Sequence, residues 1–303
     1  MDAQLTRFLT EMGPRWHLDV VGNGEQVFTF YEPYHQAESA KHPAVHHAPV
    51  TITYGTDERQ QVDLYLPVDP DGPEPGVVMF VHGGAFIRGE RNRSPWVFRN
   101  ICLDLCRQGL VVANAGYRLA PAAGYPIGAQ DVADAAVATI AALRQHGLRS
   151  ERFFLMGHSA GGTHCATALF DPVMQPKYAG LRDQVSGLIM VSPRLAADQD
   201  PRNPNVAAVA AYFGADASTY AARSPLTHLK TALHQSKERW PRIFLAMAEY
   251  ENPLLQDYAD QIKMHTEYHF YPVHNHMSII AQMGTADSPL GAAIGRFCKA
   301  ALD

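Results

Sequence analysis

The sequence predicts an α/β protein: a mostly parallel, eight-stranded sheet with helices on both faces. Two observations carry this prediction. From residue 50 onward, short β-rich runs alternate with helical stretches, which requires crossover connections between parallel strands. Several runs, such as 77–81 and 153–156, are apolar throughout, as expected of strands that are buried on both faces. The chain of 303 residues, 47% of them hydrophobic, is long enough for one large domain.

The expected strands differ in their patterns. Residues 50–54 and 62–66 alternate apolar and polar side chains, as edge strands do. Continuous apolar runs predict further strands at 77–81, 110–114, 153–156, 188–191 and 243–247, and a weaker run predicts one at 267–271. Helices are expected at 97–108, 129–146, 163–170, 254–264 and 290–302.

Two segments interrupt this alternation. Residues 1–48 combine an expected helix at 3–12 with a polar, histidine-rich stretch, and residues 193–240 are rich in Ala and Pro with short helical pieces at 206–213 and 225–234. Ligands of parallel sheets bind beyond the carboxyl ends of the strands. We therefore expect both segments to form a cap over that edge, within one domain spanning 1–303. The pair His46-His47 has no spaced metal-ligating partner, so we interpret it as part of a solvated loop.

Composition excludes several classes of function. A net charge of −5 and a pI of about 6.3 argue against binding to nucleic acid. No apolar run approaches the roughly 20 residues that a membrane helix needs, and the first residues do not resemble a signal peptide. The four cysteines lie in apolar segments, which is typical of buried free thiols in a reducing compartment. These observations predict a cytoplasmic protein.

The run Gly157-His158-Ser159-Ala160-Gly161 is the first candidate for chemistry. It follows an expected strand and precedes an expected helix. A serine on such a sharp turn has a strained backbone, and small residues are needed two positions before and after it because strand and helix crowd together there. The turn exposes the hydroxyl of Ser159 above the sheet, so we predict that it is a nucleophile. His158 is expected to point away from Ser159 and to pack structurally.

A serine nucleophile also needs donors that stabilise an oxyanion. His82-Gly83-Gly84 directly follows the strand 77–81, and two adjacent glycines let a loop turn its backbone N–H groups towards a ligand. We predict that the N–H groups of Gly83, Gly84 and Ala160 form the oxyanion hole.

The base and the carboxylate that orients it are expected after the last two strands. Glu251 is the preferred acid, with Glu249 and Asp257 as alternatives; Glu249 is closer to the strand end and could brace the loop instead. His276 is the preferred base because Ser278-Ile279-Ile280 begins a helix that could hold it, and His274 is the alternative.

Linked motifs make the chain resemble an α/β-hydrolase of the hormone-sensitive-lipase-like esterase group. They are His82-Gly83-Gly84, Tyr117-Arg118-Leu119-Ala120-Pro121, Tyr125-Pro126, Asp131, the Gly157–Gly162 run and Ser224-Pro225-Leu226. The resemblance implies the α/β-hydrolase fold with a small cap, and makes 117–121 a turn that braces the oxyanion loop. The sequence departs from the group where Glu251-Asn252-Pro253 replaces Asp before Pro-Leu, and where His276 precedes Met277-Ser278. Both departures resemble the branch of arylformamidases and small carboxylesterases.

The resulting hypothesis is a serine hydrolase that cleaves small carboxylic esters through an acyl-enzyme, a reaction that needs no metal or organic cofactor. An amidase such as an arylformamidase is one alternative, and a non-catalytic small-molecule binding protein of this fold is another. Four arginines, Arg88, Arg91, Arg93 and Arg194, follow strands that lead to the site. Any of them that faces the pocket would favour substrates with a carboxylate, and a solvated charged loop is the alternative.

Overall fold

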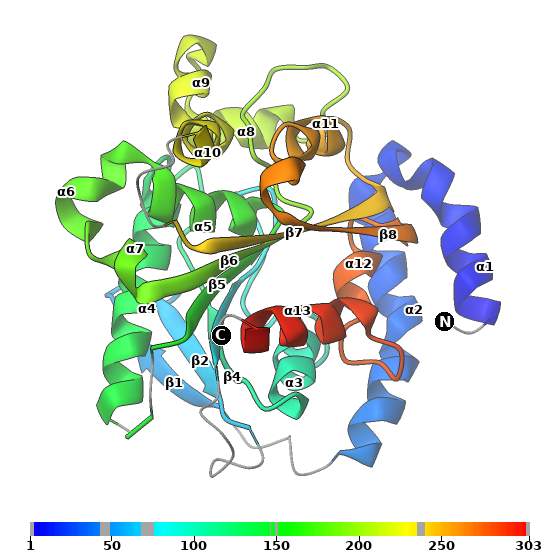
Figure 1. Cartoon of the computed structure of the whole chain (residues 1–303). Helices are drawn as coiled ribbons and strands as arrows, with labels where there is room; N and C mark the ends of the chain where they lie inside the picture. Colours follow the sequence, from blue (N-terminus) through cyan, green and yellow to red (C-terminus); the bar gives the residue numbers. More distant parts are fainter. Residues whose placement is uncertain are drawn as a thin grey trace.

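The eight expected strands form one sheet in the order β1-β2-β4-β3-β5-β6-β7-β8. The computed structural model (Figure 1) describes residues 3–42, 49–67, 76–145, 147–148, 151–234 and 240–300; His46 and His47 lie outside these ranges. The strands are β1 (Val50–Thr53), β2 (Gln61–Tyr65), β3 (Val77–Val81), β4 (Val111–Ala115), β5 (Phe153–His158), β6 (Val185–Val191), β7 (Arg242–Tyr250) and β8 (Glu267–Asn275).

The sheet is parallel from β4 through β8, whereas β1 and β2 join it antiparallel. One expectation was wrong: β2 is not an edge strand, because it pairs with both β1 and β4. Its polar residue Asp63 is buried and accepts hydrogen bonds from Arg91 at 2.9 Å and from Thr51 at 2.8 Å. An alternating pattern can therefore reflect a buried carboxylate whose partners come from elsewhere in the chain.

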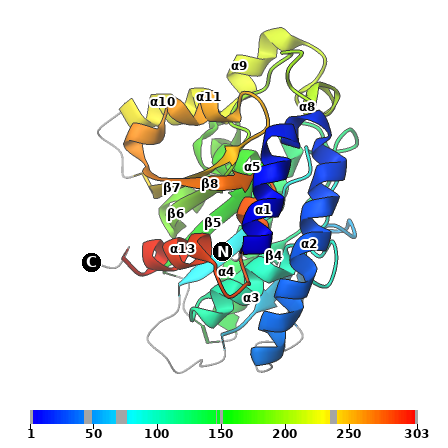
Figure 2. The same cartoon turned by 90° about the vertical axis from the view of Figure 1, so that its right-hand side faces the viewer.

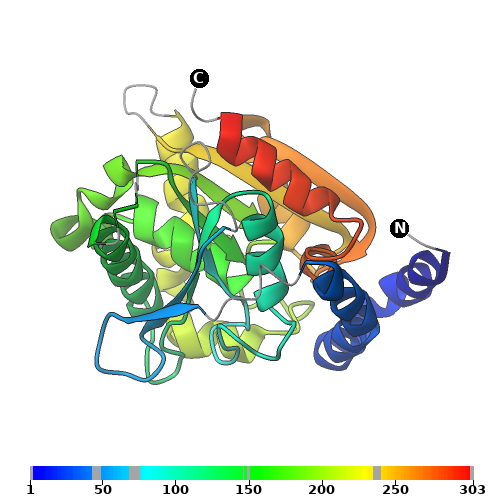
Figure 3. The ribbon, with the colours of Figure 1, turned by 90° about the horizontal axis from the view of Figure 1, so that it is seen from below.

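Helices cover both faces of the sheet, as expected. One face packs against α4 (Ile127–Gln145), α5 (Ala160–Phe170), α10 (Pro225–His234) and α11 (Leu255–Asp260). The other face packs against α3 (Arg99–Arg107), α12 (Ser278–Ala281) and α13 (Pro289–Ala300). Figure 3 shows α3 and α13 on one side of the sheet and α4 on the other. Short helices α6 (Gln175–Tyr178) and α7 (Leu181–Gln184) precede β6.

All four cysteines are buried with free thiols, as the apolar context predicted. Burial raises the pKa of Cys106 and of Cys298 to about 12, so these thiols stay protonated and unreactive at neutral pH. None of the helices among the described residues combines the length and apolar character that a membrane crossing requires.

The N-terminal segment contains a long helix that the sequence did not predict. Helix α1 (Ala3–Met12) was expected, and it continues through a 3₁₀ turn, η1 (Gly13–Leu18), into α2 (Val20–Lys41). Only a narrow stripe of α2 is buried, with Val27, Tyr31 and His35 at helical spacing. Gly22, Gly24 and Pro33 lie inside it and weaken the helical pattern in the sequence. Figure 2 shows α1 and α2 lying along one side of the domain.

The segment 193–240 forms short helices, two of them with the predicted bounds. They are α8 (Val206–Phe213), η4 (Ala217–Thr219), α9 (Tyr220–Arg223) and α10. Tyr212 of α8 stacks on Phe86 with ring centroids 4.5 Å apart, which ties this segment to the loop after β3. His228 of α10 lies 3.4 Å from the carboxylate of Asp171, at the end of α5.

Acid should strengthen the contact between His228 and Asp171. The hydrogen bond from His228 and the charge of Asp171 raise the pKa of His228 above its ordinary value of 6.5. A group whose pKa is raised by folding contributes stability below its unfolded value and loses that contribution as the pH rises through its folded value. We expect His228→Gln to lower the free energy of unfolding by about 0.5–1 kcal/mol near pH 5.5, and by clearly less near pH 9. Urea unfolding of both proteins at the two pH values measures this, and a loss that is equal at both would contradict it.

Candidate active site

Ser159 occupies a strained turn between β5 and α5. Its φ is +53°, in a region that side chains rarely adopt. A Cβ on Gly157 would lie 2.4 Å from the backbone of Gly161, and one on Gly161 would lie 2.1 Å from the carbonyl oxygen of Val81. Both positions therefore require glycine, for the crowding that the sequence pattern predicted.

Three residues far apart in the sequence meet at this turn. The Nε2 atom of His276 lies 3.0 Å from the hydroxyl oxygen of Ser159, and its Nδ1 atom lies 2.6 Å from the carboxylate of Glu251. His276 directly follows β8 and Glu251 directly follows β7. These neighbouring parallel strands end at the same edge of the sheet. The N–H of His276 also donates to the carbonyl oxygen of Tyr250 at 3.0 Å, which joins the two loops.

Glu251 is held by hydrogen bonds as well as by His276. One of its carboxylate oxygens accepts from the backbone N–H of Ala248 at 3.0 Å and from the hydroxyl of Ser192. The side chains of Glu251 and His276 are each only 5% exposed. A carboxylate at this depth is tolerated because all its contacts are with donors.

The alternative acids and base lie elsewhere. Glu249 is exposed and accepts from the backbone N–H of Val273 at 2.6 Å, so it braces the last residues of β8. Asp257 lies on α11. His274 contacts the hydroxyl of Ser278 at 3.0 Å, and burial lowers its pKa to about 4. The structure thus places His276 against Ser159 and Glu251 against His276, and it places these three residues elsewhere.

The loop after β3 brings backbone close to Ser159. A Cβ on Gly83 would lie 3.0 Å from the Cβ of Ser159, and one on Gly84, whose φ is +140°, would lie 1.9 Å from the carbonyl oxygen of Arg88. Ala160 is the first residue of α5, so its N–H has no acceptor within the helix. Of the predicted donors, Gly83 and Ala160 therefore adjoin Ser159, and Gly84 lines the same cavity as the serine.

The side chains of His82 and Tyr117 hold the loop after β3 in place. The hydroxyl of Tyr117 donates to the carbonyl oxygen of His82 at 3.0 Å, and the two rings stack with centroids 4.4 Å apart. Burial lowers the pKa of His82 to about 4, so its ring stays neutral, and its Nδ1 atom donates to the carbonyl oxygen of Gly83 at 2.7 Å. The family resemblance implied that residues 117–121 support the loop after β3, and Tyr117 makes the contacts with His82 that do so.

His158 packs structurally, as expected, but it also has a specific partner. Its Nε2 atom donates to the backbone carbonyl oxygen of His276 at 2.9 Å, and the two rings lie 4.8 Å apart. Burial lowers the pKa of His158 well below its ordinary value, which keeps this ring neutral beside His276. The residue before the serine therefore helps to hold the loop that carries His276.

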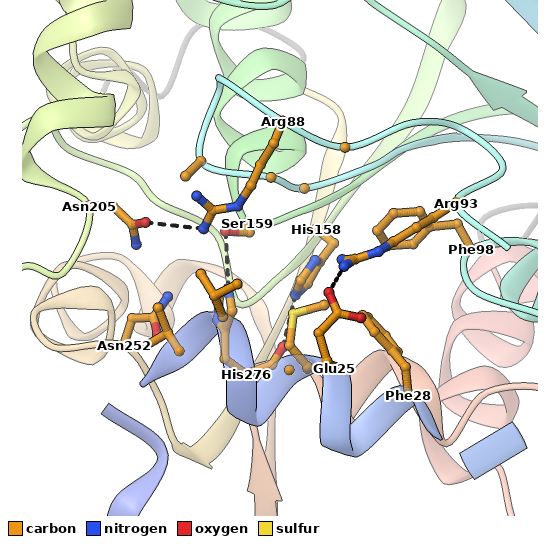
Figure 4. A pocket seen from close by; sticks show the side chains of 18 of the residues that line it. Glu25, Phe28, Arg88, Arg93, Phe98, His158, Ser159, Asn205, Asn252 and His276 are labelled. Carbon is orange, nitrogen blue, oxygen red and sulfur yellow. Dashed lines mark hydrogen bonds and ion pairs between the residues drawn. The ribbon is translucent and has the colours of Figure 1, made fainter. Parts of the chain in front are cut away.

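A cavity of about 310 Å³ opens beside Ser159 (Figure 4). Sequence reasoning did not identify the residues that line much of it. Six come from η1 and α2, and five others come from the chain after β3: Trp16, Val20, Val21, Gly24, Glu25, Phe28, Phe98, Glu90, Asn205, Asn252 and Met277. The indole N–H of Trp16 donates to the carboxamide oxygen of Asn252 at 2.9 Å. Asn252 belongs to the Glu251-Asn252-Pro253 run that departs from the family pattern. Its hydrogen bond with Trp16 joins the N-terminal segment to the loop that carries Glu251.

The four arginines divide into two pairs. Arg88 and Arg93 line the cavity. Arg91 instead pairs with Asp63 at 2.9 Å, and the buried Arg194 pairs with Asp198 at 2.8 Å, so these two have structural partners. Within the described ranges, no group of three His, Cys, Asp or Glu side chains is arranged to hold a metal ion.

Comparison with known proteins identifies the family. Residues 78–276, well over half of the chain, match the family defined by the α/β hydrolase fold. The chain belongs to this family, which confirms the predicted fold. A hyperthermophilic esterase from the archaeon Pyrobaculum calidifontis superposes with a TM-score of 0.64 at 20% identity, covering 90% of this chain and 93% of that chain.

Relatives with higher identity match only part of the chain. The isoprenylcysteine alpha-carbonyl methylesterase of Arabidopsis thaliana is 33% identical over 121 residues, which are 40% of this chain and 27% of that protein. The kynurenine formamidase of Danio rerio is 28% identical over 149 residues, which are 48% of this chain and 47% of that protein. The matches thus span about a quarter to a half of these relatives' lengths.

Proposed function

We propose that this protein is a serine hydrolase that cleaves small carboxylic esters through an acyl-enzyme. The single observation that carries the proposal is the chain of contacts from Ser159 through His276 to Glu251, at 3.0 Å and 2.6 Å, beside a cavity. A serine hydroxyl becomes a nucleophile at neutral pH when an oriented base takes its proton. The methylesterase of Arabidopsis thaliana, which is similar in sequence, supports the same reaction class, and the esterase of Pyrobaculum calidifontis has the same fold.

The proposed reaction has two steps. The oxygen of Ser159 attacks the ester carbonyl while the Nε2 atom of His276 accepts the hydroxyl proton, and Glu251 stabilises the imidazolium. The N–H groups of Gly83, Gly84 and Ala160 bind the oxyanion. The intermediate collapses as His276 returns the proton to the leaving alcohol. In the second step a water molecule attacks the acyl-enzyme by the same route and releases the carboxylic acid.

The substrate pocket is proposed to lie under a cap made by residues 1–48 and 193–240. The N-terminal segment supplies more of the cavity lining than the segment 193–240 does. Asn205 comes from the segment 193–240, and six lining residues come from the N-terminal segment: Trp16, Val20, Val21, Gly24, Glu25 and Phe28. Because η1 and α2 supply apolar walls, they set the shape of the group that can be accepted next to Ser159.

Covalent labelling tests the proposal. A fluorophosphonate probe is expected to attach to the peptide that contains Ser159, and labelling is expected to stop 4-nitrophenyl butyrate hydrolysis. A folded protein that neither reacts with the probe nor hydrolyses the ester would be a binding protein, and the proposal would be wrong. The kynurenine formamidase of Danio rerio makes N-formylkynurenine the appropriate amide for comparison; a higher kcat/KM for this amide than for short acyl esters would assign an amidase instead.

A further inference from the structure

The cavity beside Ser159 has two chemically different sides. Figure 4 shows the polar side chains of Arg88, Asn205 and Asn252 on one side of Ser159, and Phe28 and Phe98 on the other. The aromatic side also carries Arg93, which lies over the ring of Phe28 and forms an ion pair with Glu25. Its charge is therefore already neutralised.

Arg88 is different from the other three arginines around the site. Among the residues that the structure describes, its guanidinium makes one hydrogen bond, to the carboxamide oxygen of Asn205 at 3.5 Å, and has no carboxylate within the 4.0 Å of an ion pair. Glu90 also borders the cavity but forms no such pair with it. A guanidinium has five N–H donors in a planar fork, so most of those of Arg88 remain available to a ligand.

Two amide side chains add further donors on the same side. The carboxamide oxygen of the buried Asn252 accepts from Trp16, so its N–H groups remain for a ligand. The oxygen of Asn205 likewise accepts from Arg88. Asn205 also precedes the first residue of α8, and the start of a helix carries partial positive charge. This side of the cavity therefore combines hydrogen-bond donors with one positive charge that has no carboxylate partner among the described residues.

We infer that Arg88, together with the amide groups of Asn205 and Asn252, binds a carboxylate of the substrate. A planar carboxylate accepts two parallel hydrogen bonds from a guanidinium fork. The preferred substrates are then acid-bearing esters, in which one end is cleaved at Ser159 and a second carboxylate lies against Arg88. This inference rests on the proposed esterase function and assigns its substrate class.

Two matched substrate pairs test the carboxylate site. The first places the acid in the acyl group (mono-4-nitrophenyl glutarate against 4-nitrophenyl valerate), and the second places it in the alcohol (4-acetoxybenzoate against 4-acetoxybenzamide). For each pair we compare kcat/KM of the acid-bearing ester with kcat/KM of the neutral ester. In Arg88→Gln this ratio is expected to fall about tenfold in one of the two pairs. The pair that responds shows whether Arg88 binds a carboxylate on the acyl group or on the alcohol. Arg88→Glu should lower that ratio further, because it adds a like charge.

Arg202→Gln is the matched control. Arg202 is an exposed arginine of the same segment as Asn205 and pairs with Asp200, so its loss removes one positive charge without changing the cavity. Both substrate ratios should be the same in this variant as in the unmodified protein. Neutral esters that are hydrolysed while neither ratio responds to Arg88→Gln or Arg88→Glu would overturn the carboxylate site alone. Absence of both turnover and fluorophosphonate labelling would overturn the esterase function and, with it, this site.

Discussion

Replacing Ser159 by alanine is expected to lower kcat/KM for 4-nitrophenyl butyrate by at least about 10³-fold. The hydroxyl lies 3.0 Å from the Nε2 atom of His276. A water molecule in the space left by the hydroxyl would not be held in the same position and orientation, so it would not replace the nucleophile. The fold should persist, because alanine removes one oxygen and leaves the backbone of the turn unchanged. Steady-state hydrolysis combined with circular dichroism and thermal unfolding measures both effects.

Ser186→Ala provides the control for this substitution. Ser186 lies near the amino end of β6, where its hydroxyl donates to the carbonyl oxygen of Glu151 at 3.2 Å, far along the sheet from the loops that carry the site. Activity of Ser186→Ala should equal that of the unmodified protein. If Ser159→Ala retained comparable turnover, the assignment of the nucleophile would be refuted.

Glu251→Gln is expected to lower kcat/KM by about 10³-fold, whereas Glu249→Gln should change it by less than about threefold. Glutamine removes the negative charge that stabilises the imidazolium of His276. It can also turn its amide N–H towards the Nδ1 atom, which favours the wrong tautomer of the ring. Glu249 carries the same charge two residues earlier, but its contacts are with the backbone N–H of Val273 at 2.6 Å and with the hydroxyl of Tyr250, not with His276.

The two glutamate variants form a matched pair because they remove the same charge from positions two residues apart, one at the end of β7 and one directly after it. Kinetics with 4-nitrophenyl butyrate should be accompanied by thermal unfolding, since Glu251 is buried and accepts from Ala248 and Ser192. Equal losses in both variants, or the larger loss in Glu249→Gln, would show that the carboxylate had been assigned to the wrong residue.

Most of the central fold could be predicted from the sequence because its signals are local. Continuous apolar runs such as 77–81 identify strands buried on both faces, whatever their neighbours are. The Gly-x-Ser-x-Gly pattern of residues 157–161 is likewise local, although the backbone that crowds Gly161 belongs to Val81. The preferred acid and base could be placed because parallel strands end at one edge of the sheet, so that the residues after β7 and β8 must lie close to those after β5.

Other features depend on contacts between distant segments. Helix α2 has only a narrow buried stripe, and Gly24 and Pro33 lower its helix propensity; its burial against the domain outweighs this weak propensity. The buried carboxylate of Asp63 in β2 has its ion-pair partner, Arg91, 28 residues further along the chain. Four arginines with similar sequence contexts could not be distinguished until their partners were known.

The sequence by itself determined the α/β architecture, the position of Ser159 on a sharp turn after a strand and the short set of residues that could accompany it, because strand burial and the turn motif are encoded over a few residues. Only the tertiary structure decided which of two glutamates and two histidines contacts which atom. It alone also decided that Trp16 reaches Asn252 across 236 positions and that Arg88 is left without a carboxylate partner among the described residues. The physical reason is that hydrogen bonds and ion pairs are made at distances of about 3 Å, and no sequence spacing specifies such distances between separate loops.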